Sequence, residues 1–111
     1  MNIRKFLFVV FILSFFIIHN VANASNFYWV GNSGNWDDAS HWANSSGGIG
    51  GKGIPTQNDD VFIDQKSFNS TNAIITIGSS ISVKNLNIPL NQLPFTIQSP
   101  SNTIISIYGE V

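Results

Sequence analysis

The sequence contains no cysteine and few charged residues, which make up only 10% of its 111 residues. Without cysteine the chain can form neither disulfide bonds nor thiolate metal sites. Its only arginine, Arg4, lies beside Lys5 at the N-terminus. Beyond residue 24 the chain carries three lysines against five aspartates and Glu110, a net charge of −3. Nucleic-acid binding requires a basic surface, so the composition argues against nucleic acid as a partner.

Residues 1–24 have the layout of a secretory signal peptide. Two basic residues precede an apolar run over 6–18, which is interrupted by a single serine. Ala22 and Ala24 then place small side chains where signal peptidase cuts, so we expect cleavage between Ala24 and Ser25. A membrane-spanning helix needs about 20 apolar residues, more than this run supplies. The sequence predicts export to the periplasm or cell surface, with no stable membrane span after cleavage.

The chain after the signal peptide has two regions of different composition. Residues 25–58 are rich in aromatic residues and glycine, whereas residues 59–111 are rich in Ile, Ser, Thr and Asn. The stretch "YWVGNSGNWDDASHW", residues 28–42, contains all three tryptophans. Five glycines at positions 47–53 exclude a helix there and predict a surface loop.

Apolar and polar residues alternate, as in β-strands, through most of residues 59–111. The segments "VFID", "IITI", "ISV", "LNI", "FTI" and "IISIY" alternate at period two between turn-forming residues, which predicts an all-β chain with many short strands. The one helical candidate is "DDASHW", where Asp37 or Asp38 could cap a single turn that brings Trp42 toward Trp36.

The apolar pattern also suggests a corner and a repeat. In "ISVKNLNI" the first two apolar residues share one strand face and the last two share the other, so the chain must turn at Lys84 and Asn85. Apolar pairs recur 19 or 20 residues apart: Ile75 and Ile77 as Phe95 and Ile97, and Leu86 and Ile88 as Ile105 and Ile107. Short strands that meet at a corner and recur in this way are typical of a β-solenoid. A small antiparallel β-sandwich is the alternative.

The blocks "FYWVGNSGNWDDASHWANSSGG", "GIPTQNDDVFID" and "ITIGSSISVKNLNI" resemble the mature N-terminus of large secreted surface proteins of Bacteroidetes bacteria. A similar block opens some autotransporter-type adhesins. The resemblance covers residues 26–111 and implies a right-handed parallel β-helix with adhesion or other cell-surface functions. Such proteins are usually far longer. Since "TIISIYGEV" continues a strand pattern without a polar cap, we expect residues 59–111 to be truncated solenoid coils whose partners are downstream coils of the same protein.

The main candidate site consists of Tyr28, Trp29, Trp36 and Trp42. If exposed, these rings could stack on glycans or other polymers of a host or cell surface. A solenoid, however, needs a cap over the apolar end of its first coil. We expect a cap in which Trp29 and Trp36 fold onto each other across a hairpin at residues 31–35, with Trp42 completing the lid.

The aspartates are weaker candidates for a calcium site. Oxygen ligands could come from Asp37, Asp38, Asp59, Asp60 and Asp64. The spacing lacks "DxDxDG", and adjacent residues on a strand point to opposite faces. We therefore expect Asp59 and Asp60 to form an Asx-turn before a strand at 61–63, and no metal or other cofactor is predicted.

Catalysis finds little support in the sequence. His41 is the only histidine after residue 24, and its position beside Ser40 does not allow a triad with that residue. We expect His41 to face solvent or to form a hydrogen bond in the cap. The sequence thus predicts a non-enzymatic, adhesin-like structural segment. The alternatives are a small carbohydrate-binding module and the N-terminal part of a polysaccharide-degrading β-helix enzyme.

Overall fold

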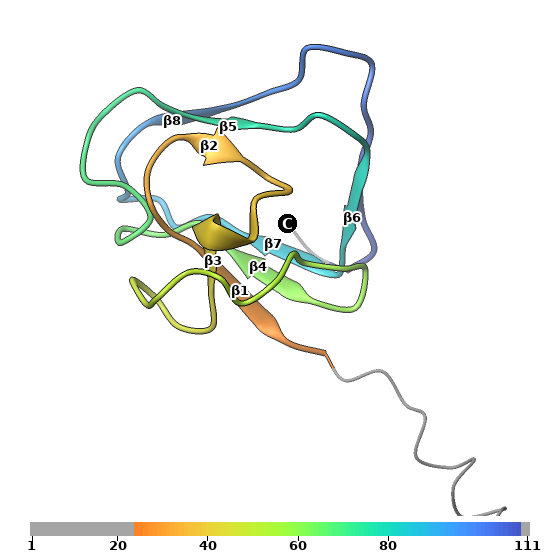
Figure 1. Cartoon of the computed structure of the whole chain (residues 1–111), viewed down its shortest axis with the longest axis horizontal. Coiled ribbons are helices and arrows are strands. Elements are labelled where there is room, and N and C mark those ends of the chain that lie inside the picture. The colour runs from red at the N-terminus through yellow and green to blue at the C-terminus, as the bar shows by residue number, and fades with distance from the viewer. Residues whose placement is uncertain (1–23, 110–111) are drawn as a thin grey trace, which may run out of the picture.

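The computed structural model describes residues 24–109 (Figure 1), so the predicted signal peptide, apart from Ala24, lies outside the described residues. Within this range the chain forms short strands and one turn of 3₁₀ helix, η1. The elements are β1 (Asn26–Trp29), β2 (Gly34–Asn35), η1 (Ala39–His41), β3 (Trp42–Ala43), β4 (Asp60–Phe62), β5 (Ala73–Thr76), β6 (Ile81–Val83), β7 (Asn85–Asn87), β8 (Phe95–Gln98) and β9 (Ile105–Ile107). The predictions of an all-β chain and of a single helical turn are confirmed.

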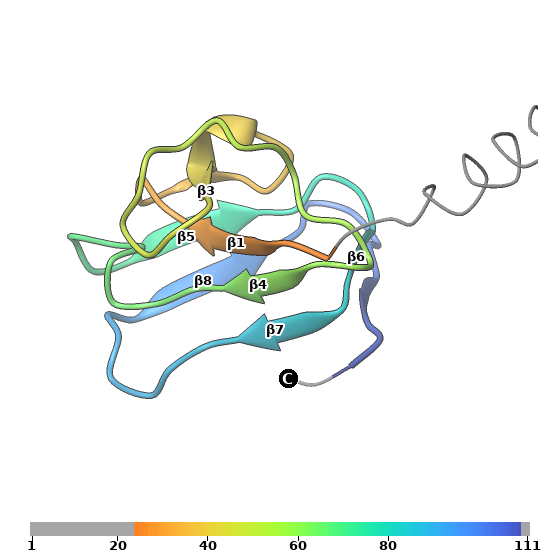
Figure 2. The ribbon, with the colours of Figure 1, turned by 90° about the horizontal axis from the view of Figure 1, so that it is seen from below.

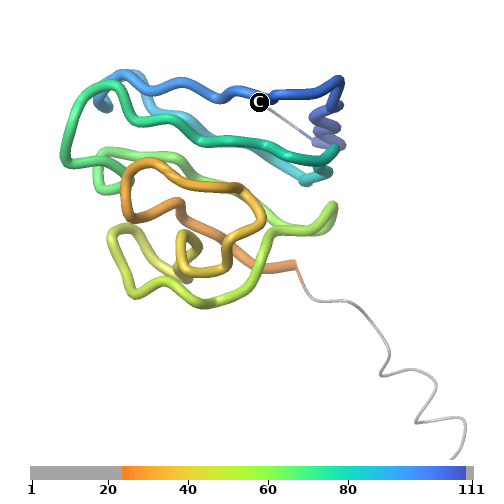
Figure 3. Tube along the Cα trace, turned by 45° about the horizontal axis from the view of Figure 1, so that its top comes forward, coloured from red at the N-terminus to blue at the C-terminus, as the bar shows by residue number. Residues whose placement is uncertain are grey.

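The strands form three sheets, which the chain visits in turn. The first sheet has the order β3-β1-β4-β7, the second β2-β5-β8, and the third pairs β6 with β9. Figure 1 shows the sheets on three sides of a common interior, and Figure 2 shows β1, β4 and β7 one beside the next. The tube in Figure 3 shows the chain passing through successive layers.

Parallel pairing predominates. Only β1 and β3 pair antiparallel, and the other five pairs found among residues 24–109 are parallel. This pairing does not match the antiparallel β-sandwich that the sequence left as an alternative. In a parallel ladder, residues at equivalent positions of neighbouring strands point to the same face. Phe27, Val61 and Leu86 are equivalent in β1, β4 and β7, and all three are buried in the core.

The repeat predicted from the apolar pattern has the wrong register. Phe95, which the sequence matched with Ile75, pairs with Ala73, 22 residues earlier. Leu86, which was matched with Ile105, pairs with Val61, 25 residues earlier. The predicted repeat assumed two strands per coil, whereas the chain passes through three sheets before it returns. In so isoleucine-rich a segment, apolar residues coincide at several offsets.

The predicted corner is confirmed at Lys84, which separates β6 from β7. Val83 and Leu86 are both buried, although they are an odd number of residues apart, because the chain turns between them. Ile88, which was expected to share the face of Leu86, is 40% exposed. The reason is that β7 ends at Asn87, so Ile88 no longer follows the alternation of that strand.

Candidate functional site

The three tryptophans pack together where β3 lies against β1. Trp29 and Trp42 are 0% exposed and Trp36 is 1% exposed. Trp42 is in the middle, with ring centroids 5.1 Å from Trp29 and 4.7 Å from Trp36, and with its ring edge-on to each. It is also edge-on to Phe27 at 6.4 Å. Edge-to-face contacts are favourable for aromatic pairs, so the four rings stabilise one another. This buried cluster of Phe27, Trp29, Trp36 and Trp42 is called the aromatic cap below.

Trp29 and Trp36 do not meet across a hairpin, which corrects the prediction from the sequence. β1 and β2 belong to different sheets. β1 pairs instead with β3, which places Trp29 opposite Trp42. Between β1 and β2 the backbone has positive φ at Gly31 (88°) and Asn32 (64°), a conformation that glycine and asparagine tolerate. These two residues turn the chain toward the second sheet and not back along β1.

Asp38 caps the short helix that leads from Trp36 to Trp42. Its carboxylate accepts hydrogen bonds from Ser40 Oγ at 2.7 Å and Ser40 N at 3.0 Å. These two bonds, the side-chain one most strongly, hold the pKa of Asp38 below its ordinary value, because they stabilise the charged carboxylate. At the end of the turn, Trp42 Nε1 donates to Trp36 O at 2.7 Å. The predicted swing of Trp42 toward Trp36 is therefore confirmed, while Asp37, the other candidate cap, is exposed.

His41 covers one side of the aromatic cap. Its ring stacks on Trp29 with centroids 4.6 Å apart and planes 5° apart. Its Nδ1 lies 2.7 Å from Val30 O, at hydrogen-bonding distance, so the expected hydrogen bond in the cap is confirmed. A Cβ at Gly34 would overlap the imidazole, and one at Gly31 would approach it closely. The two glycines of the "GNSG" turn thus make room for the histidine.

The Gly-rich loop lies over the short helix and β3, as Figure 2 shows. Gly51 N donates to Ala39 O at 2.8 Å, and Lys52 N donates to Trp42 O at 3.1 Å. A Cβ at Gly50 would overlap the backbone of the turn below it. The loop therefore packs directly against the backbone of residues 39–42, and its glycines permit this close approach of the two backbones.

Tyr28 is the one predicted aromatic site residue that is not buried. It lies on the opposite face of β1 from Phe27 and Trp29, because neighbouring strand residues alternate. Its ring stacks on Phe62 of β4, with centroids 4.6 Å apart and planes 13° apart. Phe62 was not predicted as a site residue, since the pair exists only through the parallel register of β1 and β4. Of the four predicted aromatic residues, Tyr28 is thus the one whose side chain is only partly buried.

Two of the aspartates considered as calcium ligands, Asp60 and Asp64, accept hydrogen bonds from other parts of the chain. Among residues 24–109, no group of three or more His, Cys, Asp or Glu side chains could hold a metal ion. Asp60 accepts a hydrogen bond from Asn85 Nδ2 at 2.6 Å. Asp64 accepts bonds from Ser46 Oγ at 2.6 Å and Lys66 N at 3.0 Å. Each of these carboxylates thus ties one loop or strand to another.

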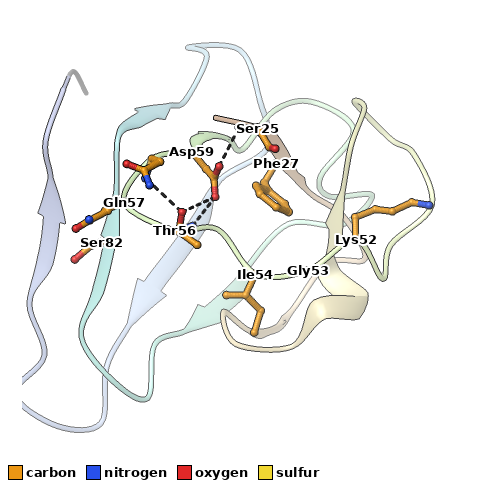
Figure 4. A pocket seen from close by; sticks show the side chains of 10 residues that line it. Ser25, Phe27, Lys52, Gly53, Ile54, Thr56, Gln57, Asp59 and Ser82 are labelled. Atoms are coloured by element: carbon orange, nitrogen blue, oxygen red, sulfur yellow. Dashed lines mark hydrogen bonds between the residues drawn. The ribbon is translucent and has the colours of Figure 1, made fainter. Parts of the chain in front are cut away.

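Asp59 has a different role from the Asx-turn that the sequence predicted. In an Asx-turn the side chain binds the backbone two residues on, but this carboxylate reaches back along the chain. Oδ2 accepts from Thr56 N at 2.8 Å and from Thr56 Oγ1 at 2.9 Å, and Oδ1 accepts from Ser25 N at 2.9 Å. Asp59 is only 5% exposed. It stands at a shallow cleft of about 800 Å³ that Phe27 and Ile54 also line (Figure 4).

This anchoring role of Asp59 was not predicted from the sequence. The "TQND" spacing, which places Thr56 three residues before Asp59, was the local signal available for the turn. The contact with Ser25 spans 34 residues and has no local signal.

The structure thus offers a closed aromatic cap under a Gly-rich loop and, beside it, a shallow cleft at Asp59. In the part of the chain from residue 24 to residue 109, no helix has the length and apolar character needed to cross a membrane. Comparison of the chain with known protein families, with curated proteins and with solved structures finds no match.

Proposed function

We propose that the chain is an exported structural segment of a bacterial surface protein, in which residues 25–58 cap a parallel β-solenoid begun by residues 59–111. The observation that carries the proposal is the order in which the chain visits its sheets. It passes through the first, second and third sheets as β4, β5 and β6, and again as β7, β8 and β9. Each strand of the second passage pairs in parallel with its counterpart in the first. In a solenoid, each coil contacts its neighbours in this way.

The contrast between the two ends supports a capping role. At one end, β3 pairs antiparallel with β1, and three buried tryptophans fill the interior. The edge of this sheet is therefore the two-residue β3 and not the longer β1, and so short an edge strand offers little backbone to a neighbouring molecule. At the other end, the second passage exposes apolar side chains, with Leu90 102%, Ile104 67% and Tyr108 67% exposed. We propose that this end receives the next coil of the same protein.

The resemblance to secreted Bacteroidetes surface proteins and autotransporter-type adhesins supports the same role. The proposal includes no catalysis and no cofactor. Glycans or other polymers of a cell surface remain partners for the longer protein rather than for the cap, because the tryptophans that a carbohydrate-binding module would present are buried. Export through a cleaved signal peptide completes the proposal.

The test compares apolar side chains at the two ends of the molecule. We expect the exported full chain to self-associate through the β7, β8 and β9 end, and Ile104→Asp to reduce that association as measured by sedimentation velocity. Ile49→Asp is the matched control, because Ile49 is 83% exposed but lies in the Gly-rich loop of the cap. Association that Ile49→Asp relieves and Ile104→Asp does not would contradict the proposed polarity. A wild-type chain that stays monomeric with strongly protected amides throughout β7, β8 and β9 would contradict the open end itself.

A further inference from the structure

A buried carboxylate lies next to the predicted cleavage site. The expected cut between Ala24 and Ser25 would convert the Ser25 amide nitrogen into a terminal α-amino group. That nitrogen lies 2.9 Å from Asp59 Oδ1 (Figure 4). We propose that Asp59 forms a binding site for an α-ammonium group, and that the ligand is the chain's own N-terminus once the signal peptide has been removed. This inference rests on the proposed export, since it requires cleavage at that bond.

Among residues 24–109, Asp59 accepts its hydrogen bonds from neutral donors and forms no ion pair. It is 5% exposed, and the donors that the structure gives it are Thr56 N, Thr56 Oγ1 and Ser25 N. All three are neutral as long as Ser25 N belongs to a peptide bond. A buried charge is costly unless it is both hydrogen-bonded and paired. An ammonium at the position of Ser25 N would supply the charge and retain the hydrogen bond.

Ser25 is held in place on its other side as well. Asp60 N donates to Ser25 O at 2.9 Å, and the parallel pairing of β1 with β4 begins at the next residue, Asn26. Ser25 is itself exposed, so removal of the preceding residues needs no rearrangement of the core. The new ammonium would therefore form where the carboxylate already accepts a bond. Charge-assisted hydrogen bonds of this kind are shorter and about twice as strong as neutral ones.

The charged side chains nearest to Asp59 in the described part of the chain do not form an ion pair with its carboxylate. Lys52 lines the same cleft, but Figure 4 shows its side chain directed away from Asp59. Asp60 accepts from Asn85 Nδ2. Lys84 gives its backbone N–H to Asp59 O at 2.9 Å, and its side chain is exposed. The N-terminal ammonium is thus the cation that the geometry brings to the carboxylate.

The ion pair would couple processing to the seating of β1. This strand lies between β3 of the cap and β4 of the following coil. An attachment at Ser25, the residue before its first, holds β1 in register with β4. It thereby also holds the side of β1 with which β3 and Trp42 pair. The mature chain would hold this strand by an ion pair, where the precursor has only a neutral hydrogen bond.

The decisive measurement is the pKa of the α-amine in the mature protein. The full precursor is expressed in a Gram-negative host, and the mass of the exported protein identifies its first residue. The rate of α-amine acetylation is then followed by mass spectrometry as a function of pH. An opposite charge at this distance raises the pKa of an amine, so we expect a value about one unit or more above the ordinary 7.7–8.0. In concentrated urea the same protein should return to the ordinary range.

Two variants separate this ion pair from a general effect of folding. Asp59→Asn should bring the pKa of the α-amine back to the ordinary range, whereas Asp60→Asn, its matched neighbour, should leave it raised. If Asp59→Asn does not fold, the comparison of folded and urea-unfolded wild type decides the question. A protein that begins at Ser25 and whose α-amine titrates in the ordinary range overturns this inference alone. A protein that begins elsewhere overturns both the expected cleavage and this inference.

The sign of the stability effect follows from the same shift. Because folding raises the pKa of the amine, the ion pair stabilises the fold fully below the unfolded pKa, and its contribution is lost as pH rises through the folded pKa.

Discussion

Replacing Trp42 and Trp36 in turn by phenylalanine tests how the aromatic cap is stabilised. The two side chains occupy the same cluster, are 0% and 1% exposed, and lose the same atoms in the substitution. Their indole N–H groups differ. Trp42 Nε1 donates to Trp36 O, whereas Trp36 Nε1 is buried with no hydrogen-bond partner among the described residues. The pair therefore isolates the polar contribution, because the loss of packing is similar in both variants.

The expected difference follows from the cost of unpaired polar groups. Trp42→Phe removes the donor to a buried carbonyl, which costs about 1–3 kcal/mol beyond the loss of packing. Trp36→Phe removes an N–H that is already unpaired, which returns a similar amount and offsets part of its packing loss. We expect Trp42→Phe to be less stable than Trp36→Phe by about 2–6 kcal/mol, the sum of these two effects. A small domain has a total stability of about 5–15 kcal/mol, so the difference is large on that scale.

Urea unfolding of the purified protein measures the free energies of unfolding. Far-ultraviolet circular dichroism is the suitable signal, because both variants change the tryptophan fluorescence. If the free energies of unfolding of the two variants lie within about 0.5 kcal/mol of each other, the assignment of the hydrogen bond is refuted. A difference that small is typical of surface substitutions that affect no specific interaction. A less stable Trp36→Phe would show that packing, and not the hydrogen bond, decides the cost.

The position of the strands could be predicted from the sequence, but their partners could not. Period-two alternation depends only on neighbouring residues, so "IITI" and "FTI" indicated β5 and β8 correctly. Which residues face one another depends on the length of the intervening loops. Ile75 therefore appeared to match Phe95 in the sequence, while it pairs with Ile97 in the sheet. The corner at Lys84 was predictable, because a change of parity within a few residues is itself a local signal.

The same distinction applies to the candidate site. The turn capped by Asp38 was predictable, because its donor is two residues away. The pairing of β3 with β1 was not, because β3 has only two residues, Trp42–Ala43, too few to show an alternating pattern. Asp59 and Ser25 are 34 residues apart in the chain. No local pattern marks a contact over that distance, so the sequence alone suggested only a local turn at Asp59.

Three further predictions concern export, the histidine and the capped turn. Replacing Ala24 by tryptophan should leave the precursor uncut, and N-terminal sequencing would show Met1 at the start of the cell-associated protein. Gly34→Ala should destabilise the fold by about 1–3 kcal/mol through overlap with the imidazole of His41, and His41→Ala should relieve that overlap, so a double-mutant cycle in urea should show coupling between the two changes. Asp38→Asn should make stability less dependent on pH at the acidic end. Folding lowers the pKa of Asp38, so its charged carboxylate stabilises the wild type above the unfolded pKa, and this contribution is lost as pH falls through the folded pKa. Asparagine still caps the turn but does not titrate, so the urea midpoints of wild type and Asp38→Asn should converge as pH falls, while Asp37→Asn, at an exposed position that makes no cap, should keep the wild-type profile. Midpoints that stay equally far apart from pH 6 to pH 2 would show that the charge on Asp38 does not stabilise the turn.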